Sequence, residues 1–140
     1  MIYDLKKILD IGEENGFAVP AFNVYNLETV MGVMQAAEET GAPVIFQMFD
    51  SQIAQYVAPI IREAMNNMKT PVAFHLDHGA GVPEVLRAFR YGATGVMIDA
   101  SRKPLEENIA ITKGVVEMAA EMGIGVEGEL GEVGKAAEGV

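Results

Sequence analysis

The residues best suited to chemistry stand together in the segment Pro71-Val-Ala-Phe-His-Leu-Asp-His-Gly79. Asp77 and His78 are adjacent there, and His75 and His78 are the only histidines in the chain. A carboxylate can accept and return a proton, and an imidazole can bind a metal ion. The apolar residues before them are typical of a buried parallel strand. Both groups are therefore expected at its carboxyl end, where α/β proteins bind their substrates.

The composition restricts the metals and partners that suit this chain. It has no cysteine, so any metal would be bound by histidine nitrogen and carboxylate oxygen atoms. The formal net charge is −10 and the basic residues are scattered, which argues against a nucleic-acid partner. A local metal ion and helix amino termini can still attract an anionic sugar phosphate. The apolar runs are short and no signal peptide is visible, so we expect a cytoplasmic protein with no membrane partner.

Helical and strand-like patterns alternate along the chain. Apolar residues at helical spacing, with Asp or Pro near the start and Gly near the end, predict helices, and short apolar runs predict strands. The predicted helices are 4–16, 28–40, one that begins near Pro59, one from Pro83 to Gly92 and one from Pro104 to Gly123. The predicted strands are 18–24, 43–47, 71–79, 95–101 and 125–131. In the last helix, we expect the buried face to contain Leu105, Ile109, Thr112 and Val116.

The alternation predicts an α/β fold of the (β/α)8-barrel class. A strand followed by a helix recurs roughly every 25 to 30 residues, the length of one βα unit, which gives about four such units and a fifth strand. Small residues follow each helix at Gly41, Gly92 and Gly123, whereas polar residues gather where strands end. That asymmetry is typical of a barrel whose active face is formed by its βα loops. A doubly wound sheet also fits the periodicity, but the segment 24–28 lacks the glycine-rich phosphate loop that such sheets often carry.

Several segments, in this order, resemble the class II, metal-dependent fructose- and tagatose-bisphosphate aldolases. They are Val19-Pro-Ala-Phe-Asn-Val24, Pro71-Val-Ala-Phe-His-Leu-Asp-His-Gly79, Val96-Met-Ile-Asp-Ala-Ser101, Glu106-Glu-Asn-Ile109 and Val126-Glu-Gly-Glu-Leu-Gly131. The resemblance implies a (β/α)8 barrel of which residues 1–140 form the amino-terminal half, with no internal domain boundary. It also implies a homo-oligomeric enzyme of carbohydrate metabolism, such as glycolysis. Its zinc, or another divalent metal, would polarise the ketose carbonyl and stabilise the enediolate formed on cleavage.

The resemblance also implies roles for individual residues. His78 would be a zinc ligand, and Glu129 a carboxylate at or near the metal. Asp77 would take the C4 hydroxyl proton during cleavage of fructose or tagatose 1,6-bisphosphate to dihydroxyacetone phosphate and an aldehyde. Supporting or substrate-binding roles would belong to Asn23, Asp99 and Ser101.

Simpler interpretations exist for these residues. Strand alternation places His75 on the same side as Asp77, where a hydrogen-bonded histidine of the core or one that supports a ligand is expected. Asp77 by itself is also consistent with an acid that caps a loop. Glu127 and Glu129 alternate onto one face, which an exposed edge strand explains equally well. The adjacency of Asp77 and His78 at a strand end favours catalysis, and we expect the chain to turn at Gly79 so that both face one pocket.

The sequence also departs from the family. His78 and Glu129 supply at most two ligands, whereas catalytic zinc generally takes three, and the family's other zinc histidines belong to the carboxyl half. The loop that normally carries the proton-abstracting glutamate has Lys135 in place of a glycine and Ala137 in place of the glutamate, with Glu138 one residue later. Two alternatives therefore stay open. One is another barrel lyase or isomerase that acts on a phosphorylated ketose, and the other is a non-catalytic half barrel that assembles with itself.

Overall fold

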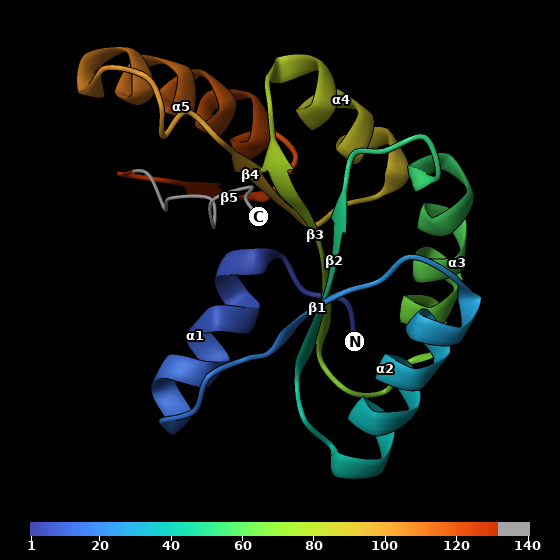
Figure 1. Ribbon diagram of the computed structural model, residues 1–140. Coiled ribbons are helices and arrows are strands. Elements are labelled where there is room, and N and C mark those ends of the chain that lie inside the picture. Colours follow the sequence, from blue (N-terminus) through green and yellow to red (C-terminus); the bar gives the residue numbers. More distant parts are fainter. Residues whose placement is uncertain (132–140) are drawn as a thin grey trace, which may run out of the picture.

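The computed structural model describes residues 1–131 and contains helices and strands in regular alternation (Figure 1). The helices are α1 (Leu5–Asn15), α2 (Leu27–Thr40), α3 (Ala54–Asn67), α4 (Val82–Tyr91) and α5 (Leu105–Ala120). The strands are β1 (Ala21–Asn23), β2 (Val44–Phe49), β3 (Val72–Gly79), β4 (Gly95–Ile98) and β5 (Gly125–Gly128). Lys135, Ala137 and Glu138 lie outside the described residues.

The strands form one parallel sheet in the order β1-β2-β3-β4-β5. Because strand–helix–strand crossovers are right-handed and the strand order never reverses, successive helices fall on the same face of the sheet. Figure 1 shows α2 to α5 around the outside of the sheet and α1 on the opposite side, where it contacts β3, β4 and β5. A doubly wound sheet would instead reverse its strand order and carry helices on both faces. The arrangement is that of consecutive units of a (β/α)8 barrel.

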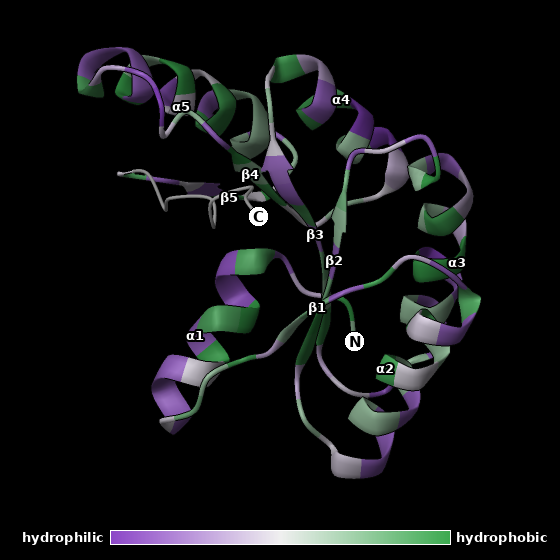
Figure 2. Ribbon diagram, in the orientation of Figure 1, coloured by the Kyte–Doolittle hydropathy of each residue, from purple (hydrophilic) through white to green (hydrophobic). Residues whose placement is uncertain are grey.

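The central strands β2, β3 and β4 are buried on both faces, as parallel strands in barrels are, whereas β1 is exposed and β5 is at most partly buried. Alternate residues such as Phe46 and Phe74 face the outer helices and belong to the larger hydrophobic cluster. Their neighbours Ile45 and Ala73 face the other way and pack with α1. Figure 2 shows that β3 becomes hydrophilic at its carboxyl end. The inner face therefore ends in polar groups at one edge of the sheet.

The start of α3 differs from the sequence prediction. The helix begins at Ala54, and Pro59 lies inside it instead of near its start. Proline removes the hydrogen bond to the carbonyl of residue i−4, here Gln55. Both Pro59 and Gln55 are exposed, so water can satisfy that carbonyl, while Ala54 and Val57 are buried against the core. The packing of the first turn therefore outweighs the loss of one hydrogen bond.

The buried face of α5 also differs from the prediction. Leu105, Ile109 and Val116 are exposed, and the residues that α5 buries are Asn108, Val115 and Ala119. The helix is rich in apolar residues all round, so its sequence offers more than one apolar stripe, and contacts with β4 and β5 select the stripe that is buried. None of the described helices combines the length and apolarity needed to cross a membrane.

Candidate metal and acid–base site

The carboxyl end of β3 contains a bulge that directs two polar side chains into the same region. Pairing between β3 and β4 becomes irregular between Leu76 and Gly79, and His78 has φ of 46°, the only positive φ of a non-glycine residue among residues 1–131. The predicted turn at Gly79 is wrong: the strand continues through Gly79, whose carbonyl accepts from the Asp99 amide at 2.9 Å. The bulge at His78 brings its imidazole to the side of Asp77.

Gly79 has a different reason to be glycine. A Cβ placed at this position would lie 2.6 Å from the carbonyl oxygen of Met97 on β4. The missing side chain therefore lets the end of β3 approach β4 closely, which brings His78 within reach of the residues that follow β4.

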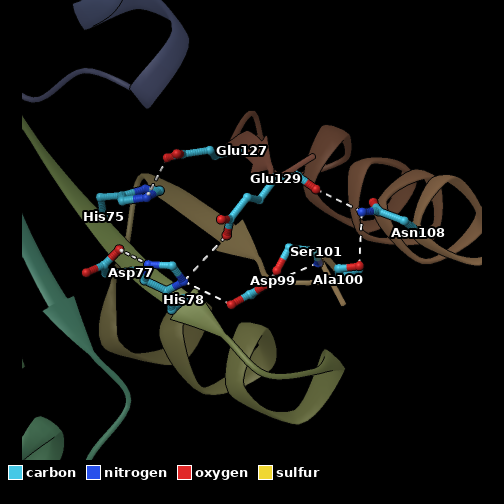
Figure 3. Close-up of polar contacts among 9 residues, drawn as sticks. All are labelled: His75, Asp77, His78, Asp99, Ala100, Ser101, Asn108, Glu127 and Glu129. Atoms are coloured by element: carbon cyan, nitrogen blue, oxygen red, sulfur yellow. Dashed lines mark hydrogen bonds and ion pairs between the residues drawn. The ribbon is translucent and has the colours of Figure 1, made fainter. Parts of the chain in front are cut away.

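His78 lies at the centre of a group of carboxylates, one on β3 and the others directly after β4 and β5 (Figure 3). Its Nδ1 atom is 3.0 Å from Asp99 Oδ2 and 3.8 Å from Glu129 Oε2. On the other side of the ring, Nε2 is 3.8 Å from Asp77 Oδ1. Because β3, β4 and β5 are parallel neighbours, residues at their carboxyl ends meet at one edge of the sheet. The fold therefore brings together Asp77, His78, Asp99 and Glu129.

Ser101 holds the Asp99 carboxylate in place. The Ser101 hydroxyl donates to Asp99 Oδ1 at 2.6 Å, and its backbone N–H donates to the same oxygen at 3.1 Å. These bonds, followed by the bond from His78, lower the pKa of Asp99 below its usual range. Oδ2 is thereby left to face His78 as a carboxylate oxygen.

Asn108 ties the ends of β4 and β5 together. Its Nδ2 group donates to the Ala100 carbonyl at 3.0 Å and to the Glu129 carbonyl at 2.8 Å, and its side chain is buried. It thereby fixes the backbone that carries Glu129. No role for Asn108 was predicted from the sequence. The available signal was an amide at helical spacing from Leu105, Ile111 and Val115, in a segment that already resembled the aldolases.

The electrostatics of this group favour a cation. The hydrogen bond to Asp99 is the main cause that raises the pKa of His78 above its usual value, and the charges of Asp77, Asp99 and Glu129 act in the same direction. Glu129 Oε2 is buried and has no hydrogen-bond partner among residues 1–131. An unpaired buried carboxylate oxygen is costly unless a further group, such as a metal ion, satisfies it.

The geometry also fits a metal ion. His78, Asp99 and Glu129 can each supply one ligand atom, and these atoms all lie within 4.8 Å of one another. One imidazole nitrogen and two carboxylate oxygens form a donor set suited to zinc and to other divalent ions. Asp77 lies beside this group with its side chain 11% exposed. His78, Asp99 and Glu129 would hold the ion, and Asp77 remains available to exchange a proton.

The other predicted polar residues lie apart from this group. His75 is buried on the inner face, where its Nε2 is 3.1 Å from Glu127 Oε2 and its Nδ1 has no hydrogen-bond partner within residues 1–131. The bond to His75 lowers the pKa of Glu127. Asn23, at the end of β1, is exposed and is paired in register with Gln47 of β2, and its side chain makes no hydrogen bond or ion pair with another residue among residues 1–131. The structure thus brings Ser101, but not Asn23, into contact with the site.

Fold and site together define the class: a (β/α)8-barrel protein in which a histidine and carboxylates converge at the carboxyl ends of the strands. The family described as fructose-bisphosphate aldolase class-II matches residues 3–140, and the chain belongs to this family. The family is metal-dependent, in agreement with the candidate metal site. The fold class and the family resemblance predicted from the sequence are thereby confirmed.

Individual relatives agree with this assignment. The chain is 41% identical to a fructose-bisphosphate aldolase of Staphylococcus aureus over 95% of its own length and 49% of that protein. It is 40% identical, with the same coverage of 95% and 49%, to the probable fructose-bisphosphate aldolase of Bacillus subtilis. Among solved structures, the YdjI aldolase of Escherichia coli K12 superimposes with a TM-score of 0.87 at 32% identity, over 94% of this chain and 53% of that one. The chain therefore spans about half the length of the proteins it matches.

Proposed function

We propose that this chain is the amino-terminal half of one (β/α)8-barrel aldolase that cleaves, or forms by condensation, a ketose phosphate. Its coverage of 49% of the Staphylococcus aureus relative supports this division of the barrel. The free edges of the sheet support it too, because β1 and β5 each pair with one strand among residues 1–131. The exposed Leu105, Ile109 and Val116 on α5 offer apolar surface for further units of such a barrel.

The observation that carries the proposal is the convergence of His78, Asp99 and Glu129 on one point beside Asp77. In this proposal His78 and Glu129 are metal ligands, and Asp99 is a third ligand or the group that orients His78. The metal is zinc or another divalent ion. When bound, it would polarise the ketose carbonyl and stabilise the negative charge that develops during cleavage. Ser101 supports Asp99, and Asn23 is assigned to substrate binding.

Asp77 is the proposed acid–base residue. In cleavage its carboxylate takes the proton of the C4 hydroxyl, the C3–C4 bond breaks, and the C4–O bond becomes the carbonyl of the departing aldehyde. The electron pair of the broken bond remains on the three-carbon fragment, which becomes dihydroxyacetone phosphate after protonation. In condensation Asp77 returns its proton to the new hydroxyl. Asp77 is partly enclosed, and its carboxylate has no polar side-chain contact among residues 1–131 that is shorter than the 3.8 Å to His78 Nε2. The carboxylate is therefore free for this exchange.

The test requires the whole protein, with its intact mass and bound metal measured on one sample. Cleavage should then be assayed with fructose 1,6-bisphosphate, tagatose 1,6-bisphosphate and other ketose phosphates. A mass well above 15.0 kDa, about one zinc per chain and cleavage that is lost on chelation would support the proposal. The native mass would at the same time test the expected homo-oligomer.

Other outcomes would favour the alternatives. A metal-loaded protein that isomerises a ketose phosphate, or cleaves it to other products, would indicate another barrel lyase or isomerase. The sequence from Lys135 to Glu138 gives this alternative its support, because it replaces the expected proton-abstracting glutamate by Ala137. A metal-free dimer of 15.0 kDa chains would contradict the aldolase proposal and indicate a self-assembling half barrel.

A further inference from the structure

An aromatic ring covers one face of the His78 imidazole. Phe49 is the last residue of β2 and is paired in register with Asp77 on β3. The ring centroids of Phe49 and His78 are 5.8 Å apart, and their planes differ by 7°. This parallel, displaced arrangement is a favourable geometry for two aromatic rings.

His78 has few other restraints. Its backbone has φ of 46°, in the left-handed region that side-chain-bearing residues rarely adopt. Its imidazole has one short hydrogen bond, from Nδ1 to Asp99, while the contacts with Asp77 and Glu129 are both 3.8 Å long. The hydrogen bond at Nδ1 restrains the two side-chain torsions of His78 at one edge of the ring, and a contact with the ring face restrains the ring plane further.

We propose that Phe49 is a positioning residue for His78: its ring fixes the plane of the imidazole so that Nδ1 points at Asp99 and Glu129. The effect of Phe49 on metal affinity rests on the proposed function, because His78 is a metal ligand only in that proposal. The positioning of the ring does not depend on it. A ligand held in its bound orientation loses less conformational freedom on binding, which strengthens metal affinity.

The segment that carries Phe49 is itself fixed by an ion pair. Asp50, the next residue, accepts hydrogen bonds from Arg87 Nε at 2.9 Å and from Arg87 Nη2 at 2.6 Å. Arg87, on α4, also donates to Glu84 at 2.8 Å. These bonds attach the end of β2 to α4, the helix that follows β3. The segments that carry the two rings are therefore joined twice, by the pairing of β2 with β3 and by the ion pair of Asp50 with Arg87.

Phe49 also lines an apolar hollow, so the experiment has to distinguish its contact with His78 from its contribution to the lining of that hollow. The hollow has a volume of about 450 Å³ and is lined by Phe49 together with Tyr25, Ile53 and neighbouring residues. Ile53 is 44% exposed and does not stack on His78. Replacement of Ile53 by Ala therefore changes the hollow without removing the ring contact, and it serves as the matched control.

The experiment compares Phe49→Leu, Phe49→Tyr and Ile53→Ala in the whole protein. Leu keeps an apolar side chain but has no ring, and Tyr keeps the ring. Without metal, the ring-proton signals of His78 are recorded by NMR and identified by their loss in His78→Gln. Zinc affinity is then measured by competition with a chromophoric chelator, and thermal unfolding reports folding.

We expect Phe49→Leu to shift the His78 signals, because the ring current of Phe49 is lost, and to weaken zinc binding by about 10-fold or more, as loss of a ligand-orienting group does. Phe49→Tyr and Ile53→Ala should retain the parent values. Unchanged signals and affinity in a folded Phe49→Leu protein would overturn the proposal. If Phe49→Leu fails to fold, Asp50→Asn, which weakens only the attachment to Arg87, should give a smaller shift in the same direction, and its absence would count equally against the proposal.

The two proposals fail in different ways. If the parent protein binds no zinc but the nuclear Overhauser contacts of the His78 ring with its other neighbours change in Phe49→Leu and not in Phe49→Tyr, the ring positioning is correct and the metal-dependent function is wrong. If zinc binds tightly to both the parent and Phe49→Leu, with no change in the His78 signals, the function survives and the positioning role is wrong.

Discussion

The parallel sheet has an amino edge, where its strands begin, and a carboxyl edge, where they end, and the two are built in opposite ways. At the amino edge of β3, polar groups are paired: the Phe74 N–H donates to Thr94 Oγ1 at 3.0 Å, and the Thr94 N–H donates back to the Phe74 carbonyl at 2.8 Å. In the same region the Glu38 carboxylate accepts bonds from Thr70 N at 2.8 Å and Thr70 Oγ1 at 2.7 Å. Each of these donors and acceptors has a partner there.

At the carboxyl edge, acceptors exceed donors. The carboxylates of Asp77, Asp99 and Glu129 surround the single imidazole of His78, and Glu129 Oε2 is buried without a hydrogen-bond partner in the described part of the chain. His78 also adopts a left-handed backbone conformation. Strain and unpaired polar groups reduce stability, and they are characteristic of functional sites. The amino edge therefore holds the fold together, whereas the carboxyl edge has the features of a ligand-binding site.

Replacement of Asp77 by Ala gives the sharpest test of the carboxyl edge. In the whole protein we expect a roughly 10²- to 10⁴-fold loss of aldol cleavage, which is typical when acid–base catalysis is lost. The fold and metal content should remain, because Asp77 approaches no polar group closer than the 3.8 Å contact with His78 among residues 1–131. Steady-state kinetics and metal analysis of the same sample would check this. Unchanged turnover would remove Asp77 from the mechanism.

Replacement of His78 by Gly separates binding from stability. We expect metal affinity to fall by more than the roughly 10- to 100-fold that loss of a supporting group causes. The free energy of unfolding of the metal-free protein should change by less than about 1 kcal/mol, because Gly relieves the strain at positive φ while it adds flexibility to the unfolded chain. Chelator competition and urea unfolding measure the two effects. Normal zinc content in this variant would refute the ligand assignment.

Replacement of Thr94 by Val tests the amino edge, where we expect a change in stability and no change in metal affinity. Val has a similar shape but leaves the Phe74 N–H without its hydroxyl partner, so we expect a loss of about 1–3 kcal/mol in the free energy of unfolding. Metal affinity should stay at the parent value, because Thr94 lies at the start of β4 and the site follows its end. Thr94→Ser keeps the hydroxyl and is the control in urea unfolding. Equal stability of Val and Ser variants would show that the bond contributes nothing.

Local patterns in the sequence were sufficient to predict the barrel class. Glycines after helices, such as Gly41 and Gly92, adopt positive φ and mark where each helix ends. The start of α3 was not predicted, because proline inside a helix is locally unfavourable and only the burial of Ala54 and Val57 compensates for it. The buried stripe of α5 was not predicted either, since its contacts with β4 and β5 decide among several apolar faces.

In the candidate site, too, some features follow from local sequence patterns and others only from tertiary contacts. The adjacent Asp77 and His78, and their position at a strand end, are visible in the sequence, whereas the bulge that turns His78 depends on the pairing of β3 with β4. The stack of Phe49 on His78 and the bonds of Asn108 join residues far apart in sequence. No local pattern encodes such contacts, because they form only when the strand register is fixed.

The smallest expected effect concerns the Glu38 carboxylate and depends on pH. The hydrogen bonds from Thr70, followed by that from Lys69, lower the pKa of Glu38 below its ordinary value of 4.5. A carboxylate with a lowered pKa in the folded state stabilises the protein above its ordinary pKa, and this stabilisation is lost as the pH falls through the lowered pKa. Glu38→Gln should therefore lower the unfolding temperature by a few degrees near neutral pH, and the difference from the parent should shrink below pH 4.5. If the difference in unfolding temperature stayed constant across this range, the bonds to Thr70 would not depend on the charge of Glu38. The contribution of Glu38 to the amino edge would then come from packing and uncharged hydrogen bonds.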